Sequence, residues 1–445
     1  MAPSATRSRV PWAAHVVAAG AVLSLAIWLS SGTMAPYAAT WPYPVVSEPC
    51  GYLYNLDHRF YFDVFQMIDG QPRAEWEQSP VLRRVLFPLL AYPLMKAAGF
   101  EVGGFIASLA FHLASLVALG RFLRTRYGDA SAVAGVWLFA LYPGITYWAA
   151  LPYANAVVVP ASCACFILLH RLDERPGVRS TVAISAALGV LFTAYDLLPF
   201  FGVAAIALLL SRRRYLEVPP AALAMAAAPV LVWLMLVRVA KIPWSNANTA
   251  LYAETLRAYL HPGSLRGWLG VLAEFPRALA VNFLFSNMLF LPVVFLVLAM
   301  SVRAPLTRAE AVLSGAIALI FAFNNLAPPH VESYPTRDDF IPRLYQPLYV
   351  VLVAYAARAI AARAALSRPL AGIAVTVFAF GLAANASVAF GPVARVPWAS
   401  HVYFRFYQHA FPESMNETLA YYGRRPLGFC DRAHPPPRVF IRQRP

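Results

Sequence analysis

Apolar runs of about 20 residues recur along most of the chain, and they restrict what it can fold into. A run of about 20 apolar residues crosses a hydrocarbon core of roughly 30 Å as a helix. Of the 445 residues, 60% are hydrophobic and only 13% are charged, which leaves too little polar surface for a soluble protein of this size. We therefore expect an all-α, polytopic membrane protein whose first run is a retained span rather than a signal peptide.

The side of the membrane on which each end of the chain lies follows from the short loops. These loops alternate between arginine-rich and arginine-poor, and short basic loops stay in the cytoplasm. With about eleven transmembrane helices, the N-terminus lies inside and the C-terminus outside, in a multi-pass protein of the plasma membrane, the inner membrane of a bacterium. The expected spans lie near residues 12–33, 102–120, 131–150, 152–170, 180–194, 197–211, 217–238, 281–302, 309–328, 346–362 and 369–390.

Residues 180–211 form one apolar stretch that allows two interpretations. It is either one long tilted helix or a hairpin of two short helices that turns at residues 193–196. Only the hairpin keeps Arg179 and Arg212 on the same side of the membrane. Asp196 at the centre of a lipid-facing helix would also cost several kcal/mol. We therefore expect the hairpin.

The two faces of the expected protein differ in size. Cytoplasmic loops are short, whereas the outer face carries long aromatic segments. We divide the chain into a transmembrane domain, residues 1–390, and an outward-facing C-terminal tail, residues 391–445. The main outer segments of the first domain are residues 34–101, 239–280 and 329–345. We expect the functional site on this outer face.

The formal charge of +15 comes almost entirely from arginine in segments between spans. Arginine next to a membrane suits phosphates and anionic headgroups, so membrane lipids rather than nucleic acid are the expected partners. Part of the arginine excess can instead reflect GC-rich coding.

Asp57 is the strongest candidate for chemistry, because it follows the first span in an aromatic segment. A carboxylate at the membrane surface can deprotonate an acceptor hydroxyl that arrives from the aqueous side. The alternative is an exposed loop aspartate or a helix N-cap. Asp63 and Asp69 are weaker rivals. No histidine or cysteine cluster has the spacing of metal ligands, so a metal site is unsupported, and we expect no cofactor.

Arginines in two outer segments are candidates for binding a donor phosphate. Arg83 and Arg84 precede an amphipathic run, and arginine binds phosphate through two parallel hydrogen bonds. The alternative is that both only anchor the chain at the interface by snorkelling. Arg337 and Arg343 lie shortly before a late span, and their alternative is a loop that pairs its own arginines and acids.

Other polar side chains of the outer segments either line a substrate cavity or only satisfy backbone groups at helix ends. The candidates for the cavity are Tyr61, Asp63, Tyr153, Asn155, Asp196 and Tyr345. Cys50 and Cys430 also fall on the outer face. They would form a disulfide in an oxidising compartment, and otherwise they are two free thiols.

Taken together, these motifs resemble the GT-C superfamily of integral membrane glycosyltransferases, in particular bacterial relatives of mannosyltransferases that use polyprenyl-phosphate sugars. The Asp-x-x-x-Tyr and Arg-x-Leu-Tyr-Pro elements of that family are similar to Asp57–Tyr61 and Arg84–Pro88. Residues 142–155 resemble its "YP…PY(T/S)E" segment, residues 192–199 lie where it carries a turn between two short helices, and residues 342–345 resemble its Arg–Tyr element.

The chain departs from the family pattern at two of these segments. Asn155 stands where the family has a glutamate, and Tyr195-Asp196 stands where it has Arg-Pro. A divergent or inactive relative is therefore an alternative to an active one.

The resemblance implies transfer of a sugar from a polyprenyl-phosphate donor to a glycan, lipid or protein acceptor outside the cytoplasm. The leaving phosphate needs little acid assistance, so one base and positive charge on the phosphate suffice. Asp57 would be the base, Arg84 with Arg337 or Arg343 would hold the phosphate, and in-line attack would invert the anomeric centre. The competing classes are a transporter or lipid flippase, and a scaffold subunit of an envelope-polysaccharide complex.

Overall fold

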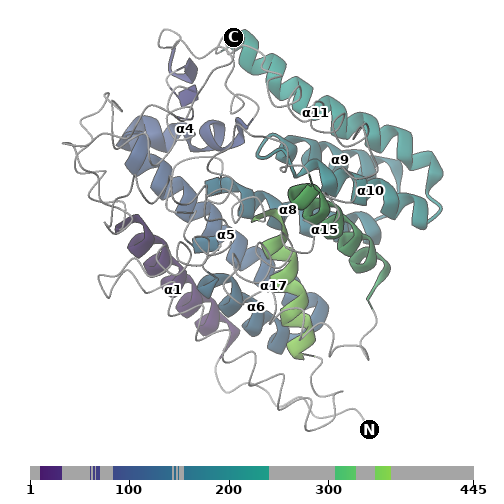
Figure 1. The fold of residues 1–445 in the computed structure, drawn as a ribbon, viewed down its shortest axis with the longest axis horizontal. Coiled ribbons are helices and arrows are strands. Elements are labelled where there is room, and N and C mark those ends of the chain that lie inside the picture. The colour runs from purple at the N-terminus through teal and green to yellow at the C-terminus, as the bar shows by residue number, and fades with distance from the viewer. Residues whose placement is uncertain are drawn as a thin grey trace, which may run out of the picture.

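The computed structural model describes residues 11–32, 61, 64–65, 67–70, 84–142, 145–146, 149, 155–239, 306–326 and 346–361. The elements of these ranges are helices, and no strand occurs among them (Figure 1). They are α1 (Trp12–Gly32), α4 (Leu86–Ala98), α5 (Phe100–Tyr127), α6 (Asp129–Leu141), α8 (Asn155–Glu174), α9 (Val178–Phe192), α10 (Pro199–Ser211), the 3-10 turn η2 (Tyr215–Glu217), α11 (Val218–Val239), α15 (Arg308–Leu326) and α17 (Gln346–Ala361).

The all-α prediction is confirmed for this part of the chain, and most helices lie where spans were expected. Val102–Tyr127, Ala156–Glu174 and Tyr215–Arg238 are long and apolar enough to cross a membrane. α5 runs well past its expected end, whereas α6 ends at Leu141, earlier than expected. The expected spans at residues 281–302 and 369–390 lie outside the described residues, so the count of eleven remains a prediction.

The hairpin within residues 180–211 is confirmed, and the single tilted helix is wrong. α9 ends at Phe192, and α10 begins at residue 199, a proline in the first turn, where its missing N–H costs no hydrogen bond. Between them, the Thr193 hydroxyl donates to the Val190 carbonyl at 2.6 Å and turns the chain.

The bundle has an enclosed centre and a lipid-facing edge. Figure 1 shows α11 along one edge and α1 towards the opposite edge, with α5, α8, α9 and α10 between them. The apolar 18-residue stretch of α8 is 72% buried, whereas that of α11 is 22% buried. α11 exposes Leu223 and Leu231. Exposed apolar side chains of this size suit contact with lipid.

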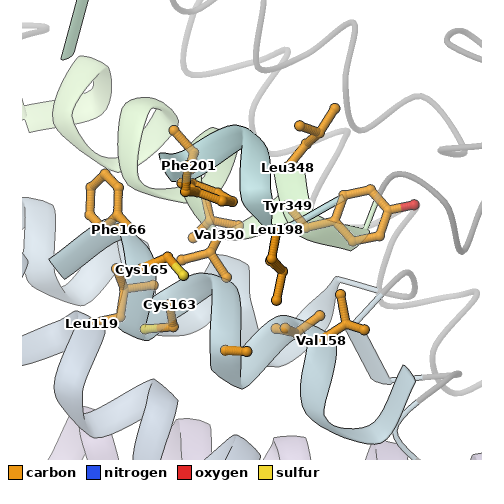
Figure 2. Close-up of a cluster of buried hydrophobic side chains, with 14 of the residues drawn as sticks. Leu119, Val158, Cys163, Cys165, Phe166, Leu198, Phe201, Leu348, Tyr349 and Val350 are labelled. Atoms are coloured by element: carbon orange, nitrogen blue, oxygen red, sulfur yellow. The ribbon is translucent and has the colours of Figure 1, made fainter. Parts of the chain in front are cut away.

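The core forms where the hairpin packs on the central helices. Leu198 and Phe201 lie in one buried cluster with Val158 and Phe166 of α8 and Val350 of α17 (Figure 2). Large apolar side chains fill this space, so the end of α10 nearest the turn is fixed between α8 and α17.

Polar contacts join one set of helix ends. Glu174 at the end of α8 pairs with Arg126 of α5, and Arg308 at the start of α15 donates to the Ser211 carbonyl at 2.7 Å. Tyr127 at the end of α5 donates to Glu310 of α15. The described ends of α5, α8 and α10 and the start of α15, all predicted to share one side of the membrane, therefore lie at one end of the bundle.

Close packing of α9 on α11 depends on Gly189. A Cβ atom at this position would lie 2.6 Å from the Met225 carbonyl oxygen, which belongs to backbone and cannot rotate away. Gly315 of α15 provides a matched comparison, because a Cβ atom there meets nothing within 4 Å.

We therefore expect Gly189→Ala to destabilise the protein by roughly 1–3 kcal/mol through overpacking. Gly315→Ala should be neutral or stabilise it by up to about 1 kcal/mol, because alanine favours the helix. Thermal unfolding of both variants in the same detergent measures the difference. Equal unfolding midpoints would contradict the close approach of α9 and α11.

Candidate functional site

The start of α4 meets the turn between α9 and α10, and two of the predicted site residues meet there. Arg84 donates to Asp196 Oδ2 from Nε at 3.2 Å and from Nη2 at 2.8 Å. Its guanidinium also lies over the Tyr195 ring, 4.6 Å from the centroid. The backbone N–H of Leu86 donates to the Thr193 carbonyl at 3.3 Å, which fixes the two chain segments against each other.

Arg84 reaches the turn because α4 runs back along α5. Gly103 allows this, since a Cβ atom there would lie 2.2 Å from the Leu94 carbonyl oxygen. Leu94 lies near the end of α4. At the start of α4, the ring of Phe87 contacts that of Phe111 in α5 edge to face, with centroids 6.5 Å apart. The start of α4 is thus level with a point about three turns along α5, about 16 Å from the beginning of that helix.

The turn between α9 and α10 is buried within the bundle. α9 has 15 residues and spans about 22 Å, which is less than a hydrocarbon core of roughly 30 Å. Irregular backbone within such a core is tolerated only where protein or a water-filled cavity covers it. The turn meets this condition, because Thr193, Ala194, Tyr195, Leu197 and Leu198 are all buried.

Burial makes the pairing of Arg84 with Asp196 important. The two side chains are only 15% and 17% exposed, so either charge alone would be poorly solvated. The Arg84 guanidinium lies against the Asp196 carboxylate and over the Tyr195 ring, within the protein. A donor phosphate at Arg84 would have to share the guanidinium with Asp196 or displace it.

Part of the first outer segment covers the same region. Tyr61 is 1% exposed, and Phe65 packs on Phe100 and on Tyr92 with ring centroids 5.7 and 5.9 Å apart. Val64 and Met67 form a second cluster with Val85 and with Trp233 and Leu236 of α11. Val64, Phe65 and Met67 are therefore held between α4, α5 and α11.

Asp69, one of the weaker rivals of Asp57, is engaged in this covering segment. Lys96 donates to it at 2.5 and 2.8 Å, and the Tyr92 hydroxyl donates at 2.7 Å. The Lys96 hydrogen bond first, and then the Tyr92 hydrogen bond, hold the pKa of Asp69 below its usual value. A lowered pKa makes a weaker base, so Asp69 is the poorer candidate for accepting a substrate proton.

A further segment of the family resemblance, at Tyr142, contacts α17. The rings of Tyr142, just after α6, and Tyr349, in the first turn of α17, contact edge to face with centroids 4.6 Å apart. Asn155, which replaces the glutamate of the family, is the first residue of α8. The Ser108 hydroxyl donates to the Ala149 carbonyl at 2.6 Å and so joins α5 to the segment before α8.

The remaining predicted residues lie outside the described part of the chain and stay predictions. They are Asp57, Asp63, Arg83, Tyr153, Arg337, Arg343, Tyr345, Cys50 and Cys430. Among the residues that the structure does describe, no group of three His, Cys, Asp or Glu side chains could hold a metal ion.

The sequence indicated Arg84 and Asp196 separately and missed that they pair. One signal was available, because an aspartate inside a long apolar stretch requires a nearby cation. The choice of Arg84 among the arginines of the outer segments depends on the path of α4. That path is set by the contact at Gly103, which sequence periodicity does not reveal.

No protein-family model and no curated protein matches the chain. Among solved structures, it is similar to the crystal structure of the Archaeoglobus fulgidus oligosaccharyltransferase in complex with zinc and sulfate. The TM-score is 0.46 at 12% sequence identity, over 82% of this chain and 53% of that one. The chain thus matches about half the length of that protein.

A double-mutant cycle tests the pairing at the turn. We expect Arg84→Ala and Asp196→Ala each to destabilise the protein by about 2–4 kcal/mol, because each leaves one charge buried alone. The double variant should lose at least about 1.5 kcal/mol less than the sum of the single variants. The measurement is unfolding in detergent.

The pair of Lys96 and Asp69, whose lysine is exposed, is the control for this cycle. Their coupling should be weaker, since the Lys96 side chain is 57% exposed and water screens the interaction. If the effects at Arg84 and Asp196 were additive, with a coupling energy no larger than that of the control pair, the pair would not stabilise the turn.

Proposed function

We propose that the chain is an integral membrane glycosyltransferase that transfers a sugar from a polyprenyl-phosphate donor to a glycan, lipid or protein acceptor outside the cytoplasm. The observation that carries the proposal is the contact of Arg84 with Tyr195 and Asp196. It joins two of the segments on which the GT-C resemblance rests, one after the first outer segment and one at the α9–α10 turn. A third segment, residues 142–155, contacts α17 through Tyr142. In the sequence, α17 follows directly on the fourth segment, residues 342–345.

In the proposed reaction, the acceptor hydroxyl attacks the anomeric carbon of the donor sugar. The bond from that carbon to the phosphate oxygen breaks, the hydroxyl proton passes to Asp57, and polyprenyl phosphate leaves with the bond's electron pair. Attack in line with the leaving group inverts the anomeric centre. No cofactor is required for this balance, because the phosphate is already a good leaving group.

Positive charge stabilises the departing phosphate in this scheme. Arg84, together with Arg83, Arg337 or Arg343, is the proposed source of that charge. Asp196 and Tyr195 would hold the Arg84 side chain in one orientation before the donor arrives, which lowers the entropy cost of binding. Tyr61, Asp63, Tyr153, Asn155 and Tyr345 complete the proposed substrate cavity.

The proposed location is the plasma membrane, with the site opening to the outer face. A Cys50–Cys430 disulfide would tether the C-terminal tail over the first outer segment there. The partners are the lipid-linked sugar, the acceptor and the surrounding membrane lipids.

One observation favours a competing class. A largely buried charge pair also occurs in transporters, whose ionisable groups lie in the bundle interior on the path of the substrate. A transporter or flippase would move a lipid-linked sugar across the bilayer without cleaving it.

Release of polyprenyl phosphate from a panel of polyprenyl-phosphate sugars separates the two classes. In lipid nanodiscs with membrane extract as acceptor, we expect Asp57→Asn to lower the release rate by at least about a hundredfold, since the reaction then lacks its base. Asp69→Asn is the matched control and should retain the wild-type rate, because Asp69 is engaged by Lys96 and Tyr92.

Near-wild-type release by Asp57→Asn would sink the assignment of the base while keeping the enzyme class. Absence of release by the folded wild-type protein from every donor, combined with movement of intact donor across vesicle membranes, would replace the glycosyltransferase by a flippase. Absence of both activities would leave the scaffold subunit.

A further inference from the structure

A compact basic surface lies at the end of the bundle opposite the α9–α10 turn. Two loops form it, one between α8 and α9 and one between α10 and α11. Arg214 ties them together, donating from Nη1 to the Leu172 carbonyl at 2.5 Å and from Nη2 to the Thr181 hydroxyl at 2.8 Å. Arg212 adds a bidentate pair with Asp173, at 2.5 and 2.6 Å.

The acids of these loops are already neutralised. Asp173 is paired with Arg212, and Glu217 is paired with Arg214 at 2.5 and 2.8 Å. Glu174 is paired with Arg126 of α5. Four exposed arginines in the last turn of α8, the two loops and the first turn of α9 have no ion pair with any described residue, and we call them the arginine surface: Arg171, Arg175, Arg179 and Arg213.

Arg213 occupies a backbone position that normally takes glycine. Its φ is 58°, and the Arg213 and Arg214 N–H groups donate to the Leu210 and Leu209 carbonyls at 2.9 Å each. This is the Schellman pattern, in which the residue after the helix adopts the left-handed conformation and is usually glycine because a Cβ is strained there. The arginine side chain is therefore present at a cost to the fold.

Apolar side chains border the arginine surface. Leu216 is 89% exposed, Tyr215 is 60% exposed and Val178 is 50% exposed. Leucine and valine this exposed would be unfavourable in water, whereas tyrosine is common at the level of lipid headgroups. The arrangement places guanidinium groups beside apolar side chains where the helices leave the membrane.

We propose that the arginine surface binds the headgroup of an anionic phospholipid, with Val178, Tyr215 and Leu216 against its glycerol and upper acyl chain. Paired arginines hold the two loops together, and the unpaired ones supply charge for the phosphate. A lipid fits better than a free anion, because a free anion leaves the apolar border unused. The proposal does not depend on the sugar-transfer reaction.

Native mass spectrometry of the full chain in detergent, titrated with phosphatidylglycerol or phosphatidylcholine, measures this binding. We expect the wild type to prefer phosphatidylglycerol. The triple variant Arg175→Gln, Arg179→Gln, Arg213→Gln should lose on the order of a hundredfold in affinity for phosphatidylglycerol, roughly fivefold per arginine. Its affinity for phosphatidylcholine should not change.

Arg213→Gly separates binding from folding. Glycine relieves the left-handed strain, so the unfolding midpoint in lipid-free detergent should rise, while the affinity for phosphatidylglycerol falls roughly fivefold. Arg238→Gln is the matched control for one lost charge. Arg238 lies in the last turn of α11, at the other end of a 22-residue helix, so this variant should bind like the wild type.

Three results would overturn the proposal. One is a triple variant that binds phosphatidylglycerol as the wild type does. Another is an equal loss of affinity in Arg238→Gln and Arg213→Gly, which would indicate a response to net charge alone. The third is full displacement of phosphatidylglycerol by millimolar inorganic phosphate, which would assign the surface to a soluble anion.

Discussion

The ion pair between Arg84 and Asp196 is the interaction on which the end of the bundle at the α9–α10 turn depends. Both side chains are largely buried, so water solvates the aspartate poorly and the acid is stable there only with a cation beside it. The pair also fixes the start of α4, and α4 in turn supports Phe65 and Asp69 of the covering segment. Helix packing, turn geometry and the candidate site are therefore parts of one arrangement.

The two ends of the bundle use arginine in different ways. At the deep turn, one arginine is enclosed with an acid and an aromatic ring, and its charge is balanced inside the protein. At the opposite end, Arg212 and Arg214 are balanced locally, while Arg213 and its neighbours remain exposed beside apolar side chains. An overall charge of +15 does not distinguish these roles, because they differ in burial and partner rather than in residue type.

Much of the helical architecture could be predicted from hydropathy, and the hairpin could be predicted because one acid and two flanking arginines exclude a single helix. Two features could not. The early end of α6 at Leu141 is not one of them, because Pro143 and Gly144 follow it almost directly and are typical of a helix end. The return of α4 along α5 depends on Gly103, whose close contact has no periodic signature. The partner of Asp196 follows from that return, so it was equally hidden. The predicted base, Asp57, lies outside the described residues.

The distance in sequence between the two members of the deep pair has a consequence for biogenesis. Arg84 precedes Asp196 by 112 residues, so the ribosome releases the arginine, α4 and α5 well before the hairpin. The hairpin then enters a membrane in which the segment that covers its turn has already been made. Synthesis in the reverse order would deliver an aspartate to the bilayer before the cation that neutralises it. A circular permutation that moved α4 behind α10 would therefore make membrane insertion of the hairpin less favourable, even if the final fold were unchanged.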